Sequence, residues 1–393
     1  MSETKNIINT GLRGVTVAST KISHVDSDAS KLIYRGYLIT DLAKNTTYEE
    51  LVHLLLFEKL PSEAQLKILN QRLASERTIP ETLIEALKTR PKTALPMDIL
   101  QAAVAMLANH DPDAATLTKE KAEDIAVKLV AKIPTIVAAW DRIRNGRAPL
   151  PPDMNLNHAA NFLYMLTGEK PDEQTARDFD ICLVLHAEHS FNASTFAARE
   201  VASTRAHMYA AVSAAVGSLS GELHGGANSR VMQMLIAIDS IDAIENYVNQ
   251  ALDSGELIMG LGHAVYKNGD PRALILAPMS KQLGERIHNT KWYELSTALE
   301  KKTKAAFKAR KGIDIYPNVD FYSASVYYSM GIPIDLFTPV FAISRIAGWA
   351  AHVIEEQFAG AAPKPALYRP SSAYIGDYCG PAECAFVPMD QRS

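Results

Sequence analysis

The chain has 393 residues, of which 47% are hydrophobic and 21% are charged, a composition typical of a soluble globular protein and not of a disordered or collagen-like chain. Its formal net charge of −4 gives no overall positive field, which argues against binding to nucleic acid or to an anionic membrane. The three cysteines are too few for a disulfide framework, and the first residues lack the apolar core of a signal peptide, so we expect a cytoplasmic location.

Short hairpin strands are predicted for the first forty residues, because β-branched and polar positions alternate there around Gly14, Asp26 and Gly36. Helices are predicted for most of the remaining chain, because apolar residues recur at three- and four-residue spacing. The clearest helical patterns cover residues 46–60, 61–75, 97–109, 119–145, 159–166 and 172–188. No strict repeat period is present, which argues against a solenoid. We therefore expect a mainly all-α fold with a short N-terminal β-hairpin region.

Two breaks rich in glycine, proline or asparagine divide the second half of the chain. They read SLSGELHGGANS at 218–229 and KGIDIYPNVD at 311–320, and the residues between them are compatible with a separate lobe. The apolar run from Phe337 to Ile354 contains a proline, an arginine and a histidine, so we expect a buried helix and not a membrane span. The tail from Phe358, rich in Pro, Gly and Ala, predicts an extended arm of the kind that often reaches a second subunit.

Three candidate catalytic residues lie at segment boundaries: His224 in GELHGGAN, His263 in GLGHAVYK and Asp320 in PNVDFYS. Each has an alternative structural interpretation. Either histidine could be a core residue bonded to backbone, and Asp320 could cap a helix beginning at Phe321. Taken together, the three favour a shared cleft, because boundary residues flanked by Gly, Pro or Asn are free to point into one.

Three arginines are candidate anion ligands: Arg272 after Asp-Pro, Arg345 inside the apolar helix, and Arg369 in the arm. An arginine in an apolar helix needs an anionic partner, because an unpaired buried charge is costly. Glu355 or Glu356 is one possible partner for Arg345. The alternative is a ligand, since guanidinium groups bind carboxylates in bidentate geometry and three of them suit a small di- or tricarboxylate.

A metal site is a further alternative, because His186 and His189 are three residues apart with Glu188 between them. On a continuous helix this spacing places both imidazoles on one face, which keeps a metal-dependent hydrolase open. The pattern matches neither H-E-x-x-H nor the usual zinc motifs, so no metal is expected. The glycines at 260 and 262 do not complete a dinucleotide-binding loop, and the basic helix from Leu299 to Lys311 is expected to be a solvated face.

Several motifs then carry a resemblance to a known family. LHGGAN, GLGHAVYKNGDPR, PNVD and SRIAG followed by YRP occur in the order found in citrate synthase and 2-methylcitrate synthase. The N-terminal GLRGVTVASTKIS and YRGY and the segment HAEHSFNAST fit as well. The chain thus resembles the citrate synthase family over almost its whole length, and its length resembles the shorter dimeric bacterial or archaeal type.

The resemblance implies a two-domain helical subunit that works as a homodimer. Residues 1–225 and 335–393 are expected to form the large domain, which holds the oxaloacetate site, and residues 226–334 the small domain, which closes over the cleft. It implies condensation of acetyl-coenzyme A with oxaloacetate to citrate, with acetyl-coenzyme A as a substrate and no cofactor or metal. Propionyl-coenzyme A, which would give 2-methylcitrate, is the alternative donor, and a non-catalytic helical scaffold is the alternative from another class.

The resemblance also implies roles for individual residues. His224 and His263 are expected to polarise carbonyl oxygens, and Asp320 is expected to be the base. His189, Arg272 and Arg345 are expected to bind oxaloacetate, Phe341 to lie against the bound acids, and Arg369 to complete the site from the neighbouring subunit. The expected contacts to coenzyme A are Leu261, Gly262, Ala264 and Lys267, although Ala264 stands where shorter members of the family commonly have arginine.

Overall fold

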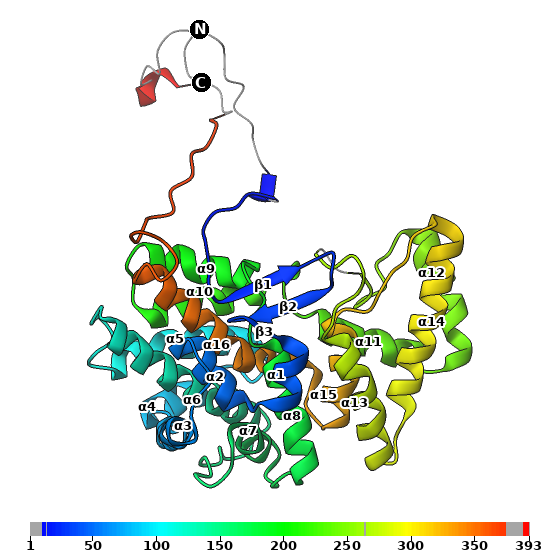
Figure 1. Cartoon of the computed structure of the whole chain (residues 1–393), viewed down its shortest axis with the longest axis horizontal. Coiled ribbons are helices and arrows are strands. Elements are labelled where there is room, and N and C mark those ends of the chain that lie inside the picture. The colour runs from blue at the N-terminus through cyan, green and yellow to red at the C-terminus, as the bar shows by residue number, and fades with distance from the viewer. Residues whose placement is uncertain (1–9, 13, 263–264, 375–387, 393) are drawn as a thin grey trace.

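The computed structural model describes residues 10–12, 14–262, 265–374 and 388–392. Figure 1 shows a body of packed helices with one small sheet on its surface. The expected mainly all-α fold with a short N-terminal β region is confirmed.

The sheet is antiparallel and consists of β1 (Ser23–Asp26), β2 (Lys31–Tyr34) and β3 (Tyr37–Leu38), in that order. A two-residue turn joins β2 to β3, and both of its residues have positive φ angles, 46° at Arg35 and 91° at Gly36. Tight hairpins favour this backbone, because its twist matches that of the flanking strands. The prediction of short hairpin strands is confirmed for residues 23–38, while residues 14–22 approach the sheet without forming a strand.

The larger group of helices surrounds a continuous apolar core. Two helices of this group begin at capping boxes that are visible in the sequence. Thr47 and Glu50 form one, and Ser62 and Gln65 form the other. The predicted helices are confirmed to within a few residues, except that the last pattern ends at His186 and not at residue 188. The group comprises α1 (Ile39–Asn45), α2 (Tyr48–Phe57), α3 (Glu63–Glu76), α4 (Glu81–Lys88), α5 (Pro96–Leu107), α6 (Lys119–Arg144), α7 (His158–Thr167), α8 (Glu173–His186), α9 (Ala193–Ser203) and α10 (Met208–Leu219).

Helix α16 (Phe337–Gln357) runs through the centre of this group and contacts α2, α6, α8, α9 and α10. Among the described residues, Ile334–Gln357 is the one segment long and apolar enough to span a membrane, but 89% of its apolar window is buried inside the protein. The prediction of a buried helix is therefore confirmed. Phe341 is the one residue of α16 that is only partly buried, because it faces a cavity.

The remaining helices lie at one side of the molecule, on the right of Figure 1, and pack mainly against one another. They are α11 (Ala227–Ile238), α12 (Ile244–Ser254), α13 (Ala273–Arg286), α14 (Lys291–Lys311) and α15 (Val319–Ser329). The basic helix α14 exposes most of its lysines, as expected for a solvated face. This group covers the segment predicted to form a small domain, but the division at residues 225/226 and 334/335 stays a prediction.

Beyond α16 the chain has no regular structure from Phe358 to Tyr374 and is mostly exposed. Tyr368 nevertheless contacts the body, where its hydroxyl donates a hydrogen bond of 2.6 Å to Glu356 and its ring stacks on Phe196. The extended arm therefore begins from an anchored position.

Candidate active site

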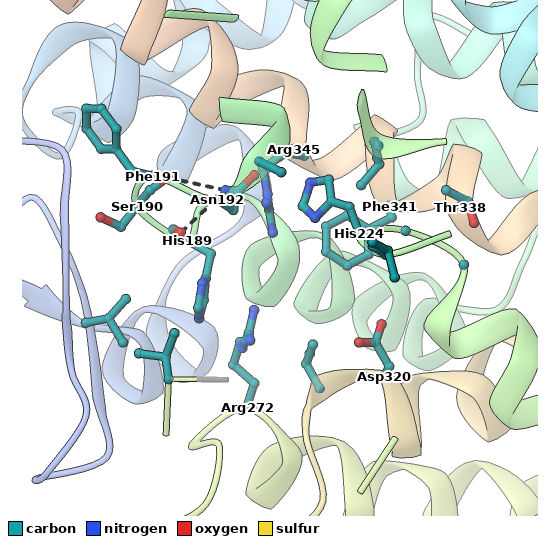
Figure 2. Close-up of a pocket in the computed structure, with 18 of the residues that line it drawn as sticks. His189, Ser190, Phe191, Asn192, His224, Arg272, Asp320, Thr338, Phe341 and Arg345 are labelled. Carbon is teal, nitrogen blue, oxygen red and sulfur yellow. Dashed lines mark hydrogen bonds between the residues drawn. The ribbon is translucent and has the colours of Figure 1, made fainter. Parts of the chain in front are cut away.

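A cavity of about 620 Å³ lies where the two groups of helices meet. Its lining comes from β1, from the loops before α9 and α11, and from the N-terminal parts of α13, α15 and α16. Six of the residues singled out from the sequence line it: His189, His224, Arg272, Asp320, Phe341 and Arg345. Figure 2 shows these side chains around one common space, although they are spread over more than 150 positions of the chain.

Asp320 is the second residue of α15, and its side chain points into the cavity (Figure 2). The helix is capped by Asn318, whose side-chain oxygen accepts a 3.0 Å hydrogen bond from the backbone N–H of Asp320. The alternative in which Asp320 itself caps the helix is therefore wrong, and its carboxylate is free of that structural task. Burial raises the pKa of Asp320 to about 6, with the positive charge of Arg272 opposing the increase and Asp270 adding to it.

His224 lies in the loop between α10 and α11. The backbone N–H of Ser194 donates a 3.0 Å hydrogen bond to its Nε2. A backbone N–H cannot accept, so Nε2 is the acceptor and the proton of the neutral ring is on Nδ1. Burial, assisted by the charge of Arg345, lowers the pKa of His224 to about 4. Near neutral pH the side chain is therefore an uncharged imidazole with a donor N–H at Nδ1.

The glycine after His224 is required by the backbone of this loop. A Cβ atom at Gly225 would lie 1.9 Å from the carbonyl oxygen of Leu219. The next residue, Gly226, has a φ angle of 74°, a conformation that residues with side chains rarely adopt. The Gly-Gly pair thus places His224 just before the N-terminus of α11.

Arg272 is buried and forms a bidentate ion pair with Asp270, in which Nε and Nη2 donate hydrogen bonds of 2.9 and 2.7 Å. Asp270 also accepts a 3.1 Å hydrogen bond from the backbone N–H of Val319, which fixes the arginine to the start of α15. Burial alone would lower the pKa of Arg272, but the Asp270 charge and hydrogen bonds raise it above its usual value. The guanidinium remains charged, and Asp270 leaves its Nη1 unused.

Arg345 is buried in α16, donates a 2.7 Å hydrogen bond from Nε to the carbonyl of His186, and lies 4.6 Å above the ring of Phe341. Among the described residues it forms no ion pair with a carboxylate. The expected partners Glu355 and Glu356 are wrong, because they lie almost three turns further along the helix and both bind Arg199. Burial lowers the pKa of Arg345 to about 10, with the charge of Glu188 opposing that change.

His186 and His189 do not share a helix face, because α8 ends at His186. His186 is fully buried and donates from Nδ1 to the carbonyl of Cys182 over 2.8 Å, whereas His189 lies in the following turn and lines the cavity. The alternative of a metal-dependent hydrolase required His186 and His189 on one helix face, and that prediction is wrong. His189 instead places Nε2 3.2 Å from the hydroxyl of Tyr266.

The described residues expected to contact coenzyme A, Leu261, Gly262 and Lys267, do not line the cavity. Leu261 pairs with Pro317, and the N–H of Gly262 donates a 2.8 Å hydrogen bond to the carbonyl of Tyr316. Lys267 is exposed and forms a 2.8 Å ion pair with Asp28 at the β1–β2 turn. The candidate residues His263 and Ala264 lie outside the described residues.

Arg369 is exposed in the arm and does not line the cavity of its own chain. The single chain therefore does not bring this arginine to the other candidate residues.

Sequence reasoning missed three residues that position the site. Asp270 holds Arg272, and its signal was its place two residues before that arginine. Ser194 fixes the tautomer of His224, and Asn192 caps α9 beside it, as the Asn-x-Ser pattern of a helix start suggests. These three residues act on neighbouring residues, Ser194 through its backbone N–H, so the sequence alone did not indicate their roles at the cavity.

Comparison with known proteins gives a consistent result. The family model described as "Citrate synthase, C-terminal domain" matches residues 11–371. The citrate synthase of Synechocystis sp. is 43% identical over 392 residues, covering 100% of this chain and 96% of the relative. The 2-methylcitrate synthase 1 of Corynebacterium glutamicum is 39% identical, covering 98% and 99%. The structure of Thermoplasma acidophilum citrate synthase in a ternary complex with carboxymethyl coenzyme A and oxaloacetate has a TM-score of 0.87 at 32% identity, covering 98% of this chain and 100% of that one.

Proposed function

Because the chain belongs to the citrate synthase family, we propose that its cavity condenses acetyl-coenzyme A with oxaloacetate and then hydrolyses the thioester, giving citrate and coenzyme A. The observation that carries this proposal is the convergence of one carboxylate of raised pKa, one neutral imidazole and two buried arginines on a single cavity. Each group supplies a separate requirement of the reaction.

The first requirement is a base for the acetyl methyl group, which is a very weak carbon acid. Asp320, with a pKa of about 6, is ionised at neutral pH and is more basic than an ordinary carboxylate. As the C–H bond breaks, the electron pair moves onto the thioester oxygen. His224 donates its Nδ1 proton in a hydrogen bond to that oxygen, where a prepared donor has its largest effect.

The second requirement is a site for the two carboxylates of oxaloacetate. Arg272 and Arg345 provide permanent positive charge, His189 provides an imidazole, and the ring of Phe341 forms one wall. We propose that Arg369 adds a third guanidinium from the neighbouring subunit of a homodimer. This assignment follows the family resemblance.

The third requirement is an electrophile. His263 is proposed to polarise the ketone oxygen of oxaloacetate and to donate a proton to it as the enolate carbon attacks the ketone carbon, so that this oxygen becomes the hydroxyl of the citryl thioester. Water then cleaves the thioester, releasing coenzyme A as a thiol. Closure of the proposed small domain would exclude water until the carbon–carbon bond has formed. No step needs a metal or an organic cofactor.

The proposed coenzyme A contacts are Leu261, Gly262, Ala264 and Lys267. Lys267 must leave Asp28 to reach the ligand, which is a small cost because an exposed ion pair contributes only about 0–1 kcal/mol. A cytoplasmic location is proposed on the sparse cysteine content of the chain.

Propionyl-coenzyme A is the second candidate donor, because 2-methylcitrate synthases are among the relatives of this chain. A single methyl group changes binding by only about 1–3 kcal/mol, so both donors are expected to react at different rates. The test is release of free thiol from acetyl- or propionyl-coenzyme A with oxaloacetate present. We expect higher kcat/KM with the acetyl donor, and no thiol release from either donor would overturn the proposal.

A further inference from the structure

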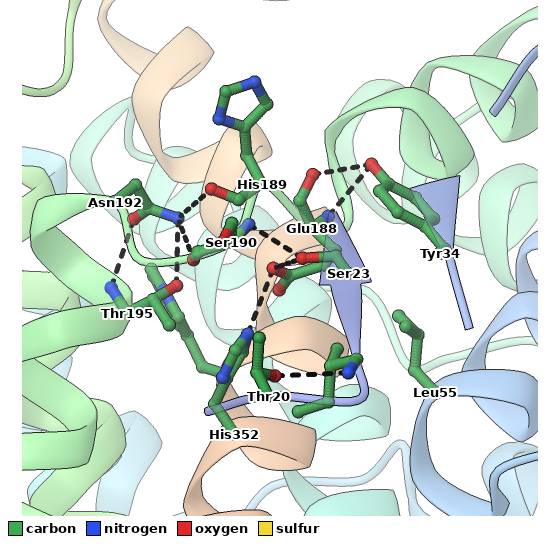
Figure 3. Close-up of polar contacts among 12 residues, drawn as sticks. Thr20, Ser23, Tyr34, Leu55, Glu188, His189, Ser190, Asn192, Thr195 and His352 are labelled. Atoms are coloured by element: carbon green, nitrogen blue, oxygen red, sulfur yellow. Dashed lines mark hydrogen bonds and ion pairs between the residues drawn. The ribbon is translucent and has the colours of Figure 1, made fainter. Parts of the chain in front are cut away.

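Glu188 is a fully buried carboxylate directly before the cavity residue His189. Its Oε1 accepts hydrogen bonds from the hydroxyl of Ser23 at 2.8 Å and from Nε2 of His352 at 3.1 Å, as Figure 3 shows. Its Oε2 has no hydrogen-bond partner among the described residues. A buried carboxylate with one oxygen unsatisfied needs compensation from a nearby positive charge.

The position of this carboxylate is set by helix α16. Arg345, Gly348 and His352 follow at spacings of three and four residues, so they lie on one face of the helix. A Cβ atom at Gly348 would lie 2.3 Å from Oε2 of Glu188 and 2.4 Å from the carbonyl oxygen of Ala187. The carboxylate thus lies against bare helix backbone on the face that carries Arg345 and His352.

His352 does not supply the compensating charge. Nη1 of Arg199 lies 2.9 Å from its Nδ1, and a guanidinium can only donate, so Nδ1 is an acceptor. The ring is therefore neutral and carries its proton on Nε2, which it donates to Glu188. The charge of Arg199 is already balanced by Glu355 and Glu356 at 2.7 and 2.6 Å.

Arg345 is the remaining cation on this helix face, and no carboxylate in the described part of the chain forms an ion pair with it. Burial raises the pKa of Glu188, and because a neutral His352 acts on it only through its hydrogen bond, the positive charge that lowers this pKa is that of Arg345. The two buried charges therefore favour each other in the folded protein.

We propose that Glu188 is the built-in counter-charge of Arg345, balancing the guanidinium in the empty site and opposing the bound dicarboxylate. The identity of that dicarboxylate as oxaloacetate rests on the proposed function. When the charge of Glu188 is removed, the ligand becomes the main counter-charge of Arg345, and its affinity should increase.

A purely structural role for Glu188 makes the opposite prediction, because a loosened turn would hold His189 poorly and weaken binding. The turn has anchors that do not depend on the carboxylate charge. The hydroxyl of Tyr34 donates to the carbonyl of Glu188 at 2.6 Å, and the hydroxyl of Ser23 accepts from the N–H of Ser190 at 3.0 Å. A glutamine at position 188 therefore leaves the turn in place.

The test is Glu188→Gln, with oxaloacetate binding measured by calorimetry. We expect tighter binding, on the order of threefold to tenfold for the removal of one buried negative charge, and a larger rise in melting temperature on adding oxaloacetate. Glu188→Asp is the matched control, because it keeps the negative charge at this position; it should bring no gain in affinity. Unchanged or weaker binding by Glu188→Gln would overturn the proposal.

A second pair of variants covers the case in which Glu188→Gln does not fold. His352→Leu removes a donor to Glu188 and favours its protonated form, so it should also tighten binding. His352→Gln offers one donor and one acceptor in place of the ring and should resemble the wild type. Weaker binding by His352→Leu would contradict the proposal.

A double-mutant cycle on protein stability measures the interaction between Glu188 and Arg345 without a ligand. Glu188→Gln should destabilise the protein by leaving Arg345 unbalanced, and Arg345→Met should relieve part of that loss, so the two effects should not add. Additive effects would contradict the proposal. Failure of the wild type to bind oxaloacetate would instead overturn the proposed function and leave this cycle as the measure of the counter-charge.

Discussion

The carboxylate of Asp320 should reduce the stability of the folded protein at neutral pH. Its pKa rises from 3.8 to about 6 on folding, so the folded state binds more protons than the unfolded state between these values. Stability from this group is therefore lost as pH rises through that window. A shift of about two pKa units corresponds to about 3 kcal/mol, and the opening of the side chain to the cavity reduces this to about 1–3 kcal/mol.

Asp320→Asn keeps the shape of the side chain and removes its charge. Its free energy of unfolding should exceed that of the wild type by about 1–3 kcal/mol at pH 7, and the gain should disappear towards pH 4. Denaturant unfolding at both pH values measures this. Asp314→Asn is the control, because Asp314 is exposed and forms a surface ion pair with Lys308, and its substitution should change stability little. A variant at position 320 that is less stable than the wild type at pH 7, or equally stabilised at both pH values, would refute the reasoning.

Three further predictions concern catalysis and folding. His224→Ala should lower kcat by about 10²–10³ with little change in melting temperature, because it removes one oxyanion donor; normal turnover would exclude that role. The kcat/KM for the acyl donor should fall as pH drops below about 6, because Asp320 must be ionised to accept a proton, and a profile flat to pH 4 would contradict this. Gly260→Ala should destabilise the protein by more than about 1 kcal/mol in thermal unfolding, because its φ angle is 78° and a Cβ atom would lie 2.7 Å from Val231. Unchanged stability would show that the loop can shift.

Helices and strands were predicted more accurately from the sequence than the hydrogen-bond and ion-pair partners of individual side chains. Helix starts were readable because capping residues such as Thr47 and Ser62 precede the apolar spacing. The end of α8 was missed because no glycine or proline marks it, and this error created a shared helix face for two histidines that the structure separates. At α15, Asn318 and Asp320 are both capping types, and only the extended backbone at Asn318 decides between them.

Partner choice depended on packing between segments far apart in the chain. Glu355 and Glu356 are near Arg345 in sequence, but Arg199 reaches them from α9 and leaves Arg345 to the cavity. The candidate residues themselves were recognisable because glycine, proline and asparagine surround them. Their convergence on one cavity required the fold.

The measurement that tests the central claim most directly is citrate formation by Asp320→Asn alongside its binding of oxaloacetate. The proposed function predicts that turnover falls by about 10²–10⁴, the usual contribution of a general base, while the dissociation constant of oxaloacetate stays close to that of the wild type. Undiminished citrate formation by a folded Asp320→Asn variant would contradict the assignment of Asp320 as the base.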